Sequence, residues 1–187
     1  SAAGYDVTLV GRQLRTSGPL TKTPFKQHRI SCFFNKGFLF YAEYNLRLFF
    51  LLAFKKMDAV CAIDLDTIVP IFLISKLKKI IKVYDAHELF CEMKEVVERP
   101  HIYSFWKWIE RKTVPHFNNG YTVNTPIKQI FQKEYGVDYS VIRNVPYLQD
   151  FALRKKVERP FIIYQGAVNH GRSFETLIPA FSFIDCP

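Results

Sequence analysis

The chain has 187 residues, and 49% of them are hydrophobic, which is enough for a packed core and excludes a disordered polypeptide. The formal net charge of +9 favours an anionic partner, such as nucleic acid, a phosphorylated substrate or an acidic membrane surface. A soluble protein with a lysine-rich exterior explains that charge equally well. The cysteines have neither a Cys-x-x-Cys pair nor a metal-like spacing, so we expect reduced thiols in a cytoplasmic protein: Cys32, Cys61, Cys91 and Cys186.

The first part of the sequence predicts two short strands and a helix. Residues 5–10 form a mostly apolar run, and residues 30–34 follow a polar, basic stretch, so both predict strands. Residues 38–55 predict a helix. This is the most apolar window of the chain, but Glu43, Asn45 and Arg47 interrupt it. It therefore predicts a core helix rather than a membrane-spanning one, with an interfacial helix as the alternative.

Residues 58–84 predict a strand–helix–strand unit. Residues 58–63 are almost continuously apolar, which is typical of a parallel strand buried on both faces. Asp64, Asp66 and Thr67 are helix-capping residue types, and Pro70 suits the first turn of the helix that follows. Residues 80–84 then predict a second strand. A crossover of this length implies that the two strands are parallel and joined by a right-handed connection.

The rest of the sequence continues the alternation. Residues 105–114 and 127–135 predict helices, with Thr125 as the expected N-cap of the second, and residues 120–124 and 139–144 predict strands. Residues 149–160 are polar and charged and predict a linker. A strand at 161–166 and a helix at 174–183 follow it. Because one strand and one helix cannot form a domain alone, we expect a fragment truncated at both ends, with a Rossmann-like domain at 1–148 and the start of a second domain at 161–187.

A polar cluster follows the second strand of the strand–helix–strand unit. Asp85, His87 and Glu88 lie where the carboxyl ends of parallel strands usually form a ligand site. Carboxylates and an imidazole suit acid–base chemistry or hydroxyl binding, although a helix cap with a solvated loop explains the same residues. Asn124 and Asn144 end two further strands at the same predicted edge and are candidates for the same cleft, with turn chemistry as the alternative.

The turn at 166–171 is a second candidate site. Gly166 and Gly171 permit a close backbone approach, and Arg172 adds a bidentate donor at the start of a helix, so the pattern favours an anion. An ordinary strand–helix turn is the alternative, because the pattern is neither a Walker A loop nor a GxGxxG fingerprint. The Trp106 and Trp108 pair with its basic neighbours favours core packing over nucleic-acid stacking.

These segments resemble, in order, the GT-B glycosyltransferases of family 4. The resemblance covers about residues 2–180, and its most specific parts are V-Y-D-A-H-E-L-F at 83–90 and Y-Q-G-A-V-N-H-G-R at 164–172; D-L-D-T at 64–67, T-V-N-T at 122–125 and V-I-R-N-V-P at 141–146 accompany them. The family has an N-terminal acceptor domain that faces a C-terminal nucleotide-sugar domain across a cleft. The resemblance implies that His87 lies near the transferred sugar and that Asp85, Glu88, Asn124 and Asn144 line the acceptor side of that cleft.

The same resemblance implies that Gly166, Gly171 and Arg172 contact the donor diphosphate, with no metal and no cofactor besides the nucleotide-sugar substrate. The glycine-rich loop and the E-x7-E element of the family are absent, so we expect the fragment itself to be inactive. The parent enzyme would transfer a sugar to a glycan or lipid-linked acceptor in the cytoplasm, with peripheral contact at the inner face of the membrane as an added option. The alternatives are a GT-B-like nucleotide-sugar epimerase and a non-enzymatic basic α/β module; nucleic acid is not the partner we expect.

Overall fold

The computed structural model describes residues 3–146, 161–166, 168 and 172–184. The chain divides into two compact units, Ser1–Asn144 and Val145–Pro187, and each is described by itself. The predicted linker at 149–160 lies outside the described residues.

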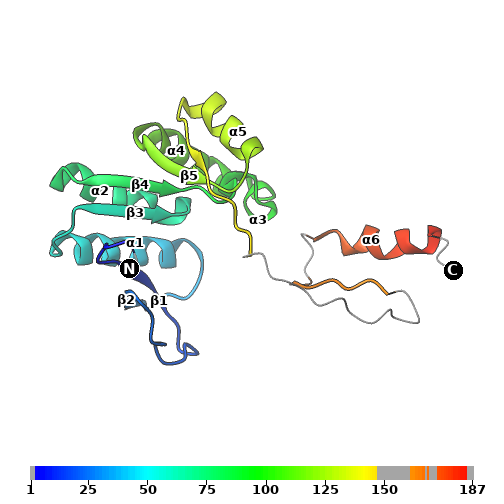
Figure 1. Ribbon diagram of the computed structural model, residues 1–187, viewed down its shortest axis with the longest axis horizontal. Coiled ribbons are helices and arrows are strands. Elements are labelled where there is room, and N and C mark those ends of the chain that lie inside the picture. The colour runs from blue at the N-terminus through cyan, green and yellow to red at the C-terminus, as the bar shows by residue number, and fades with distance from the viewer. Residues whose placement is uncertain (1–2, 147–160, 167, 169–171, 185–187) are drawn as a thin grey trace. The chain divides into compact units, whose positions relative to one another are not determined.

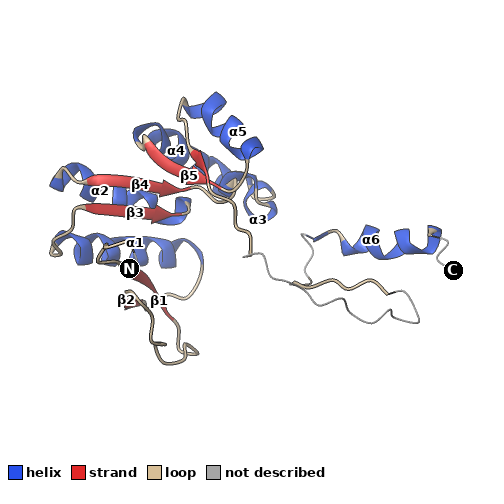
Figure 2. Ribbon diagram, in the orientation of Figure 1, coloured by secondary structure: helices blue, strands red, loops and turns tan. Residues whose placement is uncertain are grey.

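The strands of the first unit form two parallel sheets (Figure 2). The smaller sheet pairs β1 (Thr8–Gln13) with β2 (Lys26–Ser31). The larger sheet has four strands in the order β3 (Ala59–Ile63), β4 (Ile81–Asp85), β5 (Asn119–Thr122) and β6 (Ser140–Val141). Parallel strands alternating with helices confirm the expected α/β class. A single sheet does not form in the described part of the chain, because β1 hydrogen-bonds only to β2 and β3 only to β4.

α1, α2, α4 and α5 lie where the sequence predicts helices, with shifted ends, whereas the short helix α3 was not predicted (Figure 1). α2 packs against β3, β4 and α1, and α5 packs against β5 and β6. The bounds are Gly37–Ala53 for α1, Ile68–Lys78 for α2, Lys94–Val97 for α3, Pro100–Thr113 for α4 and Thr125–Tyr135 for α5, and the short 3-10 turns are η1 (Leu65–Thr67), η2 (Phe90–Glu92) and η3 (Val114–His116). The connection from β3 through α2 to the parallel strand β4 confirms the expected strand–helix–strand unit.

Several local predictions were wrong. β1 begins and ends three residues later than expected, and β2 occupies Lys26–Ser31 rather than residues 30–34. Thr125 is not the N-cap of α5. Asn124 is, because its Oδ1 accepts a hydrogen bond of 2.8 Å from the Ile127 backbone N–H. The expected capping of α2 is also absent, since Thr67 has no side-chain cap bond and its hydroxyl donates backwards to the Ile63 carbonyl at 2.8 Å.

An aromatic cluster fills the core beneath the larger sheet. The rings of Tyr84 and Phe131 are 6.2 Å apart and those of Phe131 and Tyr139 are 5.5 Å apart, and all three side chains are fully buried. Gly120 in β5 makes room for this packing, because a Cβ there would lie 2.6 Å from a ring carbon of Tyr139. The aromatic richness of the sequence, 16% of all residues, therefore has a packing role in this core.

The described part of the second unit contains the helix α6 (Phe174–Ala180) and a 3-10 turn at Phe181–Phe183, which confirms the expected helix at 174–183. The predicted strand at 161–166 was wrong, because those residues adopt no strand conformation. A strand needs a neighbour to satisfy its backbone groups, and no described residue pairs with this segment. Tyr164 instead packs edge-on against Phe174, with ring centroids 4.7 Å apart. None of the helices in the described ranges is long and apolar enough to cross a membrane.

Candidate functional site

The carboxyl ends of β3, β4 and β5 bring four polar side chains together. Ile63 pairs with Asp85, and Asp85 pairs with Tyr121. The ladder continues beyond β3 and β4, because the Asp64 N–H donates to the Asp85 carbonyl at 3.1 Å and the Ala86 N–H donates to the Tyr121 carbonyl at 2.9 Å. This register fixes Asp64 and Asp85 side by side, with His87 immediately after. We call Asp64, Asp85, His87 and Tyr121 the strand-end cluster.

His87 lies between two carboxylates. Its Nε2 is 3.3 Å from Asp64 Oδ2, and its Nδ1 is 3.5 Å from Asp85 Oδ1. The second separation is not a hydrogen bond, because Asp85 Oδ1 is buried and has no hydrogen-bond partner among the described residues. The imidazole is 40% exposed, whereas the Asp64 and Asp85 side chains are 21% and 16% exposed. Each ring nitrogen therefore lies near a carboxylate oxygen, and the ring still reaches solvent.

Tyr121 fixes the other oxygen of Asp85. Its hydroxyl donates to Asp85 Oδ2 at 2.9 Å. Burial and this hydrogen bond both raise the pKa of Tyr121 above its ordinary value, so the phenol stays protonated and remains a donor. Tyr121 could not be selected from the sequence, because it lies inside β5 and only the β4–β5 register places it beside Asp85.

Asp64 holds the most strained backbone position of the cluster. It has φ 61° and ψ 168°, a region that is favourable only for glycine and costs other residues about 1–3 kcal/mol. Its Oδ1 is buried, and no described residue forms a hydrogen bond with it. Burial raises the pKa of Asp64 to about 6, with His87 opposing the shift and the Glu88 carboxylate adding to it. A strained, partly buried carboxylate at a strand end marks a candidate binding or catalytic group.

Asp66, next to the cluster in η1, gives a test of this electrostatic picture. Burial raises its pKa to about 6, above the ordinary value of 3.8. The folded state therefore binds the Asp66 proton more tightly than the unfolded state, and stability falls as pH rises from about 4 to about 6. We expect Asp66→Asn to raise the free energy of unfolding by about 1–2 kcal/mol near pH 8 and to have little effect near pH 4.

Urea unfolding of both proteins at the two pH values measures that difference. Asp58→Asn, at an exposed position before β3, is the matched control and should change stability equally at both. A pH-independent effect of Asp66→Asn would contradict the assigned burial of the charge.

The remaining residues expected at the acceptor side fall into two groups. Glu88 is exposed, and its carboxylate lies with ligand atoms of Asp64 and His87 in a group whose members are all within 4.8 Å of one another. That trio has donor types that could hold a divalent cation or bind hydroxyl groups. Asn124 uses its side-chain oxygen to cap α5, and Asn144 is exposed beyond the end of β6. Neither makes a hydrogen bond to the strand-end cluster among the described residues.

The predicted anion site lies in the second unit and is described only in part. Gly166 has φ 154°, and a Cβ at that position would lie 2.7 Å from the Tyr164 hydroxyl, so glycine suits the bend. Arg172 is exposed just before α6. Gly171 lies outside the described residues, so the geometry of the turn as an anion site stays a prediction.

A hollow of about 470 Å³ lies between α4 and α5, away from the strand ends. Its lining includes Lys107, which is in contact with three carboxylates: 2.8 Å from Glu110, 3.0 Å from Glu134 and 3.8 Å from Glu92. The Tyr135 hydroxyl donates to Glu110 as well. Because these polar side chains already pair with one another, we assign the hollow a structural role rather than a binding role.

Comparison with known proteins adds no assignment. No family model matches the chain, and no curated protein matches it. What the molecule does must therefore be argued from the strand-end cluster.

Proposed function

We propose that this chain carries the acceptor-binding part of a GT-B type glycosyltransferase. The parent reaction would transfer a sugar from a nucleotide-sugar donor to a glycan or lipid-linked acceptor. The observation that carries the proposal is the convergence of Asp64, Asp85, His87 and Tyr121 at the carboxyl ends of three parallel strands. Parallel α/β sheets bind their ligands at this edge.

The chemistry of the strand-end cluster matches an acceptor that is rich in hydroxyl groups. Two buried oxygens, Asp64 Oδ1 and Asp85 Oδ1, have no hydrogen-bond donor among the residues that the structure describes. Leaving a buried acceptor unpaired is unfavourable, so an incoming O–H group that donates to either oxygen would bind favourably. His87 sits between the two carboxylates and reaches solvent, which suits a group close to the reacting hydroxyl.

The donor side of the proposal rests on the resemblance of residues 164–172. Gly166, Gly171 and Arg172 would bind the donor diphosphate, with backbone N–H groups and the guanidinium in place of a metal ion. The nucleotide sugar would then be a substrate, and no further cofactor would be required.

Ligand-observed NMR of the full chain with a panel of mono- and disaccharides tests the acceptor site. We expect saturation-transfer signals from one class of sugar, and we expect His87→Ala to weaken binding by about tenfold or more, since a hydrogen bond to a charged group contributes about 1.5–3 kcal/mol. His101→Ala is the matched control, because His101 is exposed on α4 and belongs to no contact of the strand-end cluster.

Three results would contradict the proposal in different ways. Binding of nucleotide sugars at the strand-end cluster, without binding of free sugars, would favour the epimerase. Binding of duplex DNA that falls steeply with salt and survives His87→Ala would favour the basic binding module. Tight binding of Mg²⁺ or Zn²⁺ that requires His87, in the absence of sugar binding, would assign the Asp64–His87–Glu88 trio to a metal instead.

A further inference from the structure

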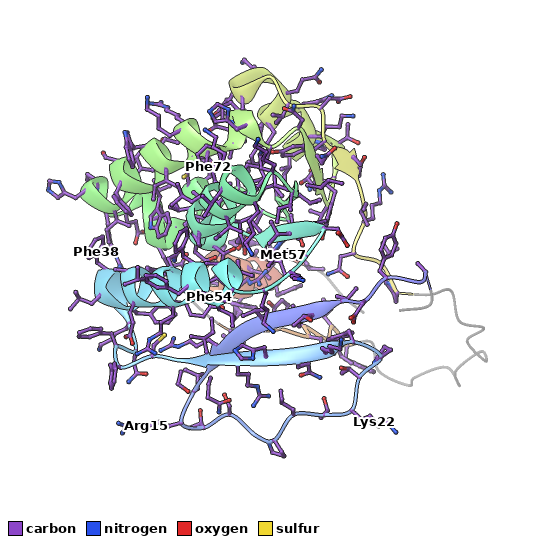
Figure 3. All side chains as sticks on the ribbon, turned by 90° about the vertical axis from the view of Figure 1, so that its left-hand side faces the viewer. Arg15, Lys22, Phe38, Phe54, Met57 and Phe72 are labelled. Carbon is purple, nitrogen blue, oxygen red and sulfur yellow. The ribbon has the colours of Figure 1, made fainter. Side chains whose placement is uncertain are left out.

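The carboxyl ends of α1 and α2 form a surface that is both basic and apolar. We call it the lysine edge, and its members are Phe54, Lys55, Lys56, Leu73, Lys76, Leu77, Lys78, Lys79 and Lys82. The two helices meet there, because Lys78 Nζ donates to the Lys55 carbonyl at 2.6 Å. β3 and β4 start at this side and point away from it in Figure 1, so the lysine edge and the strand-end cluster lie at opposite edges of the sheet. Figure 3 looks onto this side and labels Phe54.

No lysine of the lysine edge forms an ion pair with another described residue. Lys76 Nζ lies 4.3 Å from the centre of the Phe72 ring, and Lys82 Nζ lies 5.8 Å from that of Phe117. These two ammonium groups therefore contact rings rather than carboxylates, in contrast to Lys107.

Apolar side chains project among these lysines. Phe54 is 87% exposed, Leu77 is 68% exposed and Leu73 is 48% exposed. The negative end of a helix dipole accounts for lysines near the last turns of α1 and α2. The helix dipole does not explain the exposed side chains of Phe54, Leu73 and Leu77 beside these lysines. Exposed apolar residues are more often scattered singly over a protein surface than grouped in this way.

We propose that the lysine edge docks on an anionic lipid bilayer. The lysines would lie among acidic head groups, while Phe54 and Leu77 would enter the boundary between head groups and acyl chains. Nucleic acid matches the charge but provides no apolar phase for the aliphatic tips of Leu73 and Leu77. The proposal uses no residue of the strand-end cluster, so it stands or fails independently of the acceptor site.

Sedimentation of the full chain with vesicles tests the proposal. We expect binding to phosphatidylcholine vesicles that contain phosphatidylserine, little binding to phosphatidylcholine alone, and loss of binding as salt increases. Each lysine near an acidic surface contributes about fivefold to partitioning, so Lys55→Gln/Lys56→Gln should lower the partition coefficient about 25-fold. Phe54→Ser, as a separate variant, should also lower the partition coefficient, although it leaves the net charge unchanged.

The charge-matched control is Lys36→Gln/Lys94→Gln. Lys36 precedes the other end of α1, and Lys94 lies on α3, so this variant removes the same charge from exposed positions outside the lysine edge. The proposal is overturned if this control weakens vesicle binding as much as Lys55→Gln/Lys56→Gln. It is also overturned if Phe54→Ser has no effect, or if duplex DNA binds more tightly than acidic vesicles and loses binding on substitution of Lys55 and Lys56.

Discussion

Replacing Lys107 by methionine is expected to lower the free energy of unfolding by about 3–5 kcal/mol, because it leaves a buried carboxylate without its cation. Lys107 Nζ lies 2.8 Å from Glu110, whose side chain is only 3% exposed. Burial by itself lowers the pKa of Lys107, but hydrogen bonds to Glu110, Tyr135 and Glu134 raise it above its ordinary value. Lys107 therefore stays charged, and its ammonium group compensates the buried Glu110 carboxylate.

Two further variants isolate the cause of that loss. Lys107→Met/Glu110→Gln removes both charges and should recover a large part of the stability, because a neutral pair has no uncompensated ion. Lys112→Met alters an exposed lysine on the same helix and should change stability by about 0.5 kcal/mol or less. Urea unfolding monitored by circular dichroism measures all three. If the double variant is as unstable as the single one, lost packing rather than the charge is responsible.

The sequence pattern predicted elements whose signals are local. The apolar run at 58–63, the lysines at 76–79 and the return at 80–84 sit next to one another in the chain, and β3, α2 and β4 form there. The Lys107 network was not predictable in this way, since Glu134 is 27 residues distant and reaches Lys107 only through the packing of α4 and α5. Periodicity identified α4 as a helix but could not say which residues of another helix face it.

The strand-end cluster was predictable in part for the same reason. Asp85 is the last residue of β4 and His87 lies two residues further on, so the rule that ligands lie at strand carboxyl ends was sufficient to select them. The sequence predicts a helix-capping role for Asp64, because aspartate before an apolar run usually has that role. Its actual backbone conformation, with positive φ, directs the residue into the cluster instead and is not encoded by residue type. Asn124 has a role that the sequence did not predict, since its side-chain oxygen caps α5; its place in a cleft stays a prediction.

Asp64→Gly is expected to stabilise the protein and to abolish acceptor binding. Glycine adopts the backbone conformation of Asp64 without strain, so the substitution removes a strain energy of about 1–3 kcal/mol. It also removes the Asp64 carboxylate, whose pKa burial raises to about 6 and whose charge therefore destabilises the folded state near neutral pH. The greater freedom of glycine in the unfolded chain offsets about 0.5–1 kcal/mol of this gain. We expect a net increase of about 2–3 kcal/mol in the free energy of unfolding near neutral pH.

Matched variants separate the two contributions and connect them to function. Lys79→Gly also relieves a positive φ, of 56°, but lies at the end of α2 and should stabilise the chain without affecting sugar binding. Asp64→Asn keeps the strain and removes only the charge, so it should gain less than Asp64→Gly. Thermal unfolding and saturation-transfer NMR of the three proteins provide both readouts. If the strained Asp64 carboxylate is retained for binding, only Asp64→Gly should combine a gain in stability with a loss of sugar affinity. A loss of stability in Asp64→Gly would instead mean that the contact with His87 outweighs the strain and that Asp64 has a structural role.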